Sequence, residues 1–401
     1  MHIKIETADI QKKIQLNRLE NNYPFGFNVA GYLSKDFGLG FAARNTVKLL
    51  LDNDFSVSIF DIPLQGYAGQ CSPIDESLVP ASDNPFPYFV TIFHVNPNQL
   101  SQFLTYYTPF SASHINLLVP FWELEQAPAS WIEMCSFIDL FLAPSHFIEK
   151  GLQALFTEKK VLYYQQTCEL PFEVIPDRKR FGIPEDKTVF FQSFDIASDI
   201  VRKNPIATIN AFYKAFEYDT HVLLILNVNV TNCHGLFMTA LSKLKGYVST
   251  LPNVIVFDDA KNYNEVLSLC ACCDILVSLH CAEGLGLSLI EAMLMGKGVI
   301  TTAYSGNLDY VNIENACLAP FRRIPAVSVF NPSLSGTILG FDPFWADPDT
   351  NQAAIWMRKL HEDVPFRNSM KEKAKKSIEL FLAESRKASV FFLLKELYSK
   401  V

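Results

Sequence analysis

Apolar segments of strand length alternate with segments of helical periodicity along this chain, and the alternation runs twice. The first series predicts strands at 27–33, 55–60, 88–93, 115–119 and 138–143, with helices at 41–51 and 129–135. The second predicts strands at 188–193, 222–226, 254–257, 275–280 and 299–302, with helices at 205–216, 265–272 and 288–295. Strands that alternate with helices form parallel sheets covered by helices on both faces. The sequence therefore predicts an α/β protein with two doubly wound, Rossmann-like domains.

The boundary between the two series lies near 169–177, which contains Pro171 and Pro176. Helical sequence continues from about residue 353 to the end. We therefore expect an N-terminal domain over 1–170 and a C-terminal domain over 171–380. A last helix over 381–401 is expected to pack back toward the N-terminal domain.

Charge and hydropathy exclude several classes of protein. The formal net charge is −8, so a nucleic-acid partner is not expected. The densest apolar runs are far shorter than a membrane span, and the first fifteen residues lack the apolar core of a signal peptide. A cytoplasmic protein is expected. Four lysines at 371, 373, 375 and 376 indicate either a solvated helix face or peripheral contact with an anionic membrane.

The segment 274–293 carries the strongest chemical signal. A strand ends near His280, a loop with Glu283 and glycines follows, and a helix bearing Glu291 begins. Such a loop, with Gly284 and Gly286, and the helix start after it favour an anion such as a diphosphate. Carboxylates accept hydrogen bonds from hydroxyls, so the two glutamates would hold a ribose and a sugar on either side of the diphosphate. Arg202 and Lys203, which we place at a helix start, would supply the cations.

Several motifs in order resemble retaining glycosyltransferases of the GT-B fold, in particular glycosyltransferase family 4 enzymes of bacterial surface-polysaccharide assembly. Glu283 and Glu291, separated by seven residues, match the family's paired-glutamate signature. Further matching segments are 121–124 through 143–145, 194–195 through 202–205, 304–307 and 345–348. One departure is that many members place an arginine several residues before the lysine, where Ala197 stands here.

The resemblance implies two domains that face each other across a cleft and a nucleotide-sugar donor, with retention of anomeric configuration. The acceptor would be a glycan or a lipid-linked glycan. Glu291 would hold the ribose, and Arg202 and Lys203 would hold the diphosphate. The donor sugar would be held by Glu283 and by the backbone of Gly284, Leu285, Gly286 and Leu287. The resemblance further implies donor-binding roles for Gly38, Gly40, Phe257 and Asp258.

Weaker signals come from the first domain. His94 ends a strand and is a candidate for contact with the donor sugar, the alternative being a strand-end histidine of the core. Trp122, Glu123 and Asn96 are weaker candidates on the acceptor side.

No metal or other cofactor is expected. The cysteines at 270, 272, 273 and 281, with His280, lack the spacing of a zinc site, and we expect buried thiols. The acidic triplet at 52–54 is typical of a turn.

Two alternatives remain open. A nicotinamide-dependent oxidoreductase would use the glycine loop at Gly38 and Gly40 with Asp61, but Ala43 replaces the third glycine. A non-catalytic sugar-binding protein of the same fold would have lost turnover.

Overall fold

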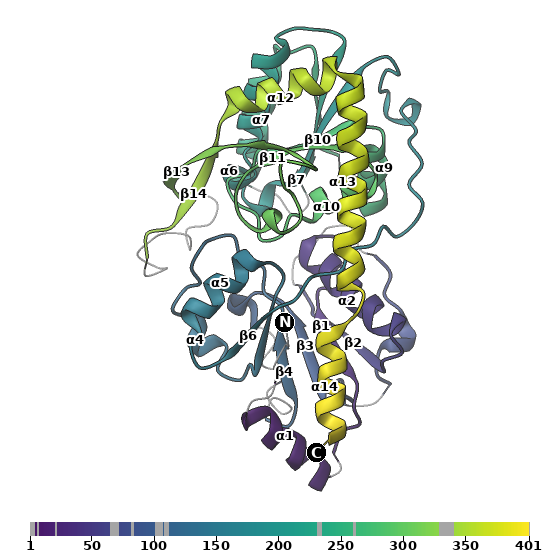
Figure 1. The fold of residues 1–401 in the computed structure, drawn as a ribbon, viewed down its shortest axis with the longest axis vertical. Coiled ribbons are helices and arrows are strands. Elements are labelled where there is room, and N and C mark those ends of the chain that lie inside the picture. Colours follow the sequence, from purple (N-terminus) through teal and green to yellow (C-terminus); the bar gives the residue numbers. More distant parts are fainter. Residues whose placement is uncertain are drawn as a thin grey trace. The chain divides into compact units, whose positions relative to one another are not determined.

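The computed structural model describes residues 5, 8–20, 22–64, 72–81, 84–100, 107, 112–230, 235–259, 262–328 and 341–400. The chain divides into two compact units (Figure 1). The first combines the described residues of Met1–Gln65, Cys71–Cys168 and Leu382–Val401, and the second those of Glu169–Phe381. The C-terminal segment of the chain therefore belongs to the first unit.

The first unit contains a parallel six-stranded sheet in the order β2-β1-β3-β4-β5-β6. Its strands are β1 (Phe27–Gly31), β2 (Val57–Asp61), β3 (Val90–His94), β4 (Ile115–Leu118), β5 (Leu140–Ala143) and β6 (Lys160–Tyr163). Its helices include α1 (Ala8–Glu20), α2 (Gly38–Asp52), α4 (Trp131–Met134), α5 (His146–Leu155) and α14 (Ser389–Lys400).

Both faces of this sheet are buried, as a parallel sheet requires. Neighbouring residues along one strand enter different apolar clusters: Val29 belongs to one and Ala30 to the other. Helix α14 covers the first cluster, where the Phe391 ring lies 5.2 Å from the Phe27 ring. The side-chain amide of Asn17 in α1 donates to the Tyr398 hydroxyl at 3.4 Å, which joins the two ends of the chain.

The second unit contains another parallel six-stranded sheet, in the order β12-β11-β10-β7-β8-β9. Its strands are β7 (Thr188–Asp195), β8 (Val222–Asn229), β9 (Val254–Phe257), β10 (Ile275–Ser278), β11 (Gly298–Thr302) and β12 (Cys317–Ala319). Its helices are α6 (Ile200–Lys203), α7 (Pro205–Phe216), α8 (Leu236–Val248), α9 (Tyr263–Ala271), α10 (Leu287–Leu294), α12 (Thr350–Glu362) and most of α13 (Val364–Ser385). An antiparallel hairpin of β13 (Phe321–Pro325) and β14 (Phe344–Pro348) extends from the unit (Figure 1).

Each sheet has a point at which the direction of winding reverses. In the first unit β1 lies between β2 and β3, and in the second β7 lies between β10 and β8. Ligands of open α/β sheets bind beyond the carboxyl ends of the strands at such a point. Residues that follow β1, β3, β7 and β10 are therefore placed for function by topology alone.

The expectation of two doubly wound α/β domains is confirmed, but some predicted boundaries were wrong. Helix α2 begins at Gly38 and not at Phe41, so both glycines of the predicted loop lie in its first turn. The hairpin was not predicted, because its two strands are separated by a long stretch without a hairpin turn signal. None of the helices within the described ranges has the length and apolarity needed to cross a membrane.

Candidate functional site

The loops that follow β7 and β10 are joined at the switch point of the second sheet. The backbone N–H of Cys281 donates to the carbonyl of Arg202 at 2.7 Å. The Arg202 guanidinium donates to the carbonyls of Ala282 and Ser198, each at 2.9 Å. These bonds bring the predicted cations next to the predicted glycine loop, although 80 residues separate Lys203 from Glu283.

Glu283 is the centre of a buried ionic cluster. Its Oε1 accepts from Lys203 Nζ at 2.5 Å, and its Oε2 lies 3.4 Å from Arg202 Nη1. Burial disfavours the charged form, but the charges of Lys203 and Arg202 outweigh burial and hold the pKa of Glu283 at about 2. Glu283 is therefore ionised at neutral pH. The structure thus brings together three residues that the sequence singled out.

Arg202 and Lys203 do not lie at a helix start, as the sequence had suggested. They occupy the last turn of the single-turn helix α6, and Asn204 then caps α7 by accepting from the backbone of Ala207 at 3.2 Å. Arg202 is only 7% exposed. The argument from an unfavourable helix dipole was therefore wrong, because basic side chains are favourable in the last turn of a helix.

The backbone around this cluster is strained. Asp199, Asn204 and Ser305 have φ values of 77°, 49° and 75°, in the left-handed region that residues with a side chain rarely adopt. Each one makes a bond that fixes the site: Asp199 caps the α6 N–H groups, Asn204 caps α7, and Ser305 Oγ accepts from the Glu283 N–H at 2.8 Å. Strain of this kind is concentrated at functional sites.

The glycine loop leads directly into α10. Gly286 has φ 87°, and a Cβ there would lie 2.8 Å from the Tyr310 hydroxyl. That hydroxyl hydrogen-bonds the carbonyls of Leu285 and Gly286, both at 2.8 Å. Helix α10 starts at Leu287, so its first N–H groups are open to an anion. Glu291 lies in this helix, whereas Glu283 precedes the loop.

Glu291 has a different environment from Glu283. Its Oε1 accepts from the Tyr263 hydroxyl of α9 at 2.8 Å. Burial raises its pKa to about 7, although the bond from Tyr263 works in the opposite direction. The two glutamates therefore differ in charge state: at neutral pH Glu283 is fully ionised and Glu291 only in part.

Acidic residues lie at the carboxyl ends of two further strands of this sheet. Asp195 ends β7, and burial raises its pKa to about 6. In the sequence, Asp195 stood out only as part of a motif. Its position at the end of the first strand of this sheet is the signal that could have identified it as a site candidate. Phe257 ends β9, and the neighbouring Asp258 forms an ion pair with Lys245 of α8 at 2.5 Å.

In the first unit His94 and Gly31 are paired at the carboxyl ends of β3 and β1, at the switch point. A Cβ at Gly31 would lie 3.1 Å from the His94 Cβ. His94 is fully buried, and neither ring nitrogen has a hydrogen-bond partner among the described residues. Burial lowers the pKa of His94 to about 3, so the ring is neutral.

The remaining first-unit candidates have structural contacts. Asn96 accepts from the Phe121 N–H at 2.8 Å and braces the segment that carries Trp122 and Glu123. The Trp122 indole donates to the carbonyl of Gln126 at 2.7 Å. Gly40 packs tightly, because a Cβ there would lie 2.2 Å from the Lys35 carbonyl oxygen, whereas a Cβ at Gly38 would meet nothing within 4 Å.

The candidate metal motifs form no cluster in the described ranges. The cysteines at 270, 272, 273 and 281 are free and buried, as expected. Asp52 pairs with Lys48 at 2.6 Å, and no group of three or more potential metal ligands occurs in the part of the chain that the structure describes.

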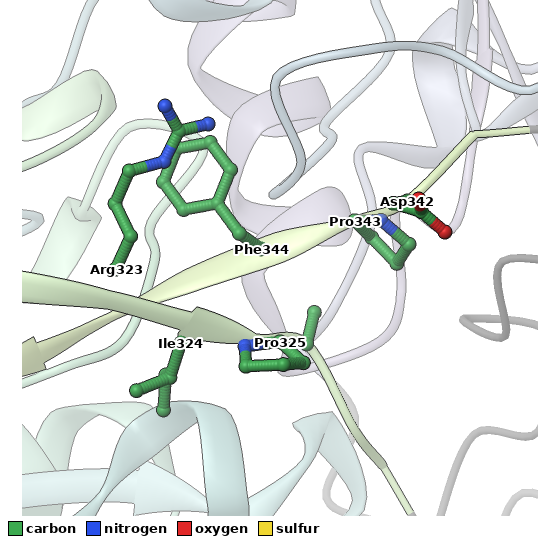
Figure 2. A pocket seen from close by; sticks show the side chains of 7 residues that line it. Arg323, Ile324, Pro325, Asp342, Pro343 and Phe344 are labelled. Carbon is green, nitrogen blue, oxygen red and sulfur yellow. The ribbon is translucent and has the colours of Figure 1, made fainter.

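A pocket of about 540 Å³ lies elsewhere, at the β13–β14 hairpin (Figure 2). The Arg323 guanidinium lies over the Phe344 ring at 3.4 Å from its centre. None of the predicted site residues lines this pocket. The ionic cluster, with its joined loops and strained backbone, is therefore the stronger candidate site.

Comparison with known proteins agrees with this choice. Residues 243–321, which contain the glycine loop and both glutamates, match the family described as glycosyl transferases group 1. No curated protein matches the sequence.

Solved structures show that the fold is that of the GT-B glycosyltransferases. Sucrose-phosphate synthase from Thermosynechococcus elongatus superposes with a TM-score of 0.69 at 14% identity, covering 94% of this chain and 100% of that one. HepE of Anabaena, in complex with UDP and glucose, gives 0.59 at 14% identity over 92% and 99% of the two chains. The pneumococcal O-GlcNAc transferase GtfA, in complex with UDP and GlcNAc, gives 0.53 at 12% identity, covering 77% of this chain and 56% of that longer one.

Proposed function

We propose that this chain is a glycosyltransferase that moves a sugar from a nucleotide-sugar to a glycan or lipid-linked glycan acceptor. The observation that carries the proposal is the buried cluster of Glu283, Lys203 and Arg202 at the switch point of the second sheet. The match of residues 243–321 to glycosyl transferases group 1 supports it, as do solved relatives with UDP bound.

Different residues would bind different parts of the donor. The N–H groups at the start of α10, together with Lys203 and Arg202, would hold the diphosphate. Glu283 would accept hydrogen bonds from hydroxyls of the donor sugar, since its low pKa keeps it a pure acceptor. Glu291 would do the same for the ribose.

Departure of the nucleoside diphosphate is the demanding step. The bond between the anomeric carbon and a phosphate oxygen breaks, and a bond from that carbon to the acceptor oxygen forms. The acceptor hydroxyl loses its proton, which the departing phosphate oxygen can accept. Lys203 and Arg202, already fixed by protein contacts, would stabilise the negative charge that develops. We propose retention of configuration and no metal requirement on the resemblance to family 4 enzymes.

Thermal unfolding with a panel of ligands tests the proposal first. A nucleoside diphosphate or nucleotide-sugar at about 100 times its dissociation constant should add about 2.7 kcal/mol of stability, with or without a chelator. Sugar transfer to an added acceptor, with the product's anomeric configuration read by NMR, then tests catalysis and retention. Stabilisation by nicotinamide dinucleotides alone would contradict the proposal, and binding without turnover would indicate a non-catalytic protein.

A further inference from the structure

Among the described residues, Tyr263 is the one side chain that the structure shows hydrogen-bonded to Glu291. The sequence had not singled it out. Its hydroxyl lies 2.8 Å from Glu291 Oε1. We infer that Tyr263 is a positioning residue, which orients the Glu291 carboxylate for the donor ribose and keeps it an acceptor. The inference rests on the proposed function, because it concerns how Glu291 holds the nucleotide.

The position of Tyr263 is fixed by the start of α9. Asn262 and Glu265 form a reciprocal capping box: Asn262 Oδ1 accepts from the Glu265 N–H at 2.9 Å, and Glu265 Oε2 accepts from the Asn262 N–H at 3.2 Å. Glu265 also pairs with Arg180 at 3.0 Å. Tyr263 is the first residue after the cap, and α9 packs on α10, which carries Glu291. Tyr263 therefore reaches the Glu291 carboxylate from the capped N-terminus of α9.

The chemistry of the contact suits a diol ligand. A carboxylate offers about four acceptor positions, and a vicinal diol needs two. The tyrosine hydroxyl uses one position on Oε1 and leaves room for both ribose hydroxyls. A donated hydrogen bond also favours the ionised form of a carboxylate. Here it opposes the burial that raises the pKa of Glu291 to about 7.

No other described group around Glu291 would favour its ionised form in place of Tyr263. Strands β10 and β11, which pack against α10, carry no ionisable side chain. On α9 the charge of Glu291 acts on the thiol of Cys270, but burial is the main cause that raises the pKa of this thiol to about 12 and keeps it neutral. Lys297 donates to the carbonyl of Ala271 at 2.5 Å and is thus held by the backbone. The charge of Glu291 therefore depends on burial and Tyr263.

Tyr263→Phe isolates the hydroxyl. Affinity for UDP, GDP and ADP is measured by calorimetry from about pH 6 to 9 in the altered and unaltered proteins. We expect the midpoint of the Glu291-dependent rise in affinity to move to higher pH. Affinity near pH 7 should fall about three- to tenfold. The loss should be smaller at high pH, where both proteins carry an ionised Glu291 and only the orienting contact is missing. The titration of the ligand phosphate is common to both proteins and cancels in the ratio.

Tyr247→Phe is the matched control. Its hydroxyl donates to Asn210 at 2.7 Å on the exposed surface of α8, so its loss should leave the pH profile unchanged. Unfolding of the ligand-free proteins against pH gives a second measurement, in which Tyr263→Phe should shift the titration of Glu291 upward.

The outcomes separate the two proposals. An unchanged midpoint would overturn the role of Tyr263 in keeping Glu291 ionised, and unchanged affinity at every pH would overturn its orienting role as well. Either result would leave the proposed function standing. If the unaltered protein bound no nucleoside diphosphate at any pH, the proposed function would fail and this inference with it.

Discussion

Lys203 Nζ lies 2.5 Å from Glu283 Oε1, so a cation assigned to the diphosphate is bonded to the carboxylate assigned to the sugar. Arg202 reinforces the pair at 3.4 Å from the other carboxylate oxygen. In the proposed function the donor must share or replace these bonds. A donor phosphate that binds Lys203 would take a hydrogen bond away from Glu283. A hydroxyl of the donor sugar could then replace that bond, so binding of the phosphate and of the sugar would be coupled through this cluster.

A double-mutant cycle on this pair should show strong coupling. Lys203→Met alone leaves the buried Glu283 carboxylate without its nearest partner, and such a loss costs up to about 3–5 kcal/mol in the free energy of unfolding. Glu283→Gln alone leaves the part-buried Lys203 and the buried Arg202 without their carboxylate. The double variant should lose less than the sum of the two, since the Lys203–Glu283 pair is then removed as a unit and only Arg202 lacks its carboxylate. Urea unfolding measures all four proteins. Losses that simply add would show that the pair contributes no net interaction.

The same lysine should also matter for turnover. Loss of a preorganised charge that stabilises a transition state lowers kcat by roughly 100-fold or more. We expect Lys203→Ala to show this loss in sugar transfer at saturating donor. Lys214→Ala is the control, because the Lys214 ammonium donates to Thr350 and Asn351 at the surface of α7. An unchanged rate for Lys203→Ala would remove Lys203 from the site.

Glu291→Gln should stabilise the ligand-free protein in alkaline solution. The folded-state pKa of about 7 lies above the value of an unfolded glutamate, so folding takes up a proton between the two values. Stability from this group is complete at low pH and is lost as the pH rises toward 7. Glutamine imitates the protonated form and should recover up to roughly 3 kcal/mol at about pH 8. Denaturant unfolding at about pH 8 and 4.5 measures this, and an equal gain at both values would point to packing instead of charge.

Much of this fold could be predicted, because apolar runs separated by helical patterns specify parallel sheets without knowledge of tertiary contacts. Segment 27–33 and segment 188–193 were both correctly expected as strands, and each lies beside a switch point. The hairpin of β13 and β14 escaped prediction because its pairing joins strands that no short turn connects. Local patterns carry little information about such distant partners.

The residue types of the site could be predicted from the sequence, but the contacts between these residues could not. Glu283 and Glu291 are visible from their spacing, and Lys203 from its motif. The bond between Lys203 and Glu283 and the bond from Tyr263 to Glu291 arise from tertiary packing across 80 and 28 positions. The opposite pKa shifts of the two glutamates follow from those contacts and from burial, neither of which spacing encodes.

His94 should make the protein sensitive to acid. Its folded-state pKa of about 3 lies below that of an exposed histidine, so the unfolded chain binds a proton that the folded chain does not. Stability from the neutral ring is complete above about pH 6.5 and falls as the pH drops toward 3. We expect His94→Phe to flatten the dependence of unfolding free energy on pH in this range. His221→Ala, at an exposed position, is the control, and an unchanged curve for His94→Phe would contradict the buried neutral ring.

Gly38 and Gly40 form a matched pair that separates packing from binding. A Cβ at Gly40 would lie 2.2 Å from the Lys35 carbonyl oxygen and 2.4 Å from that of Tyr32, so Gly40→Ala should destabilise the protein by about 1–3 kcal/mol. A Cβ at Gly38 meets nothing within 4 Å, and alanine favours a helix. Gly38→Ala should therefore leave thermal stability equal or slightly raised. If the donor diphosphate approaches this backbone, as the resemblance implies, Gly38→Ala will weaken nucleotide-sugar affinity in calorimetry while the fold stays intact. Unchanged affinity would exclude Gly38 from donor binding and leave α2 a structural role there.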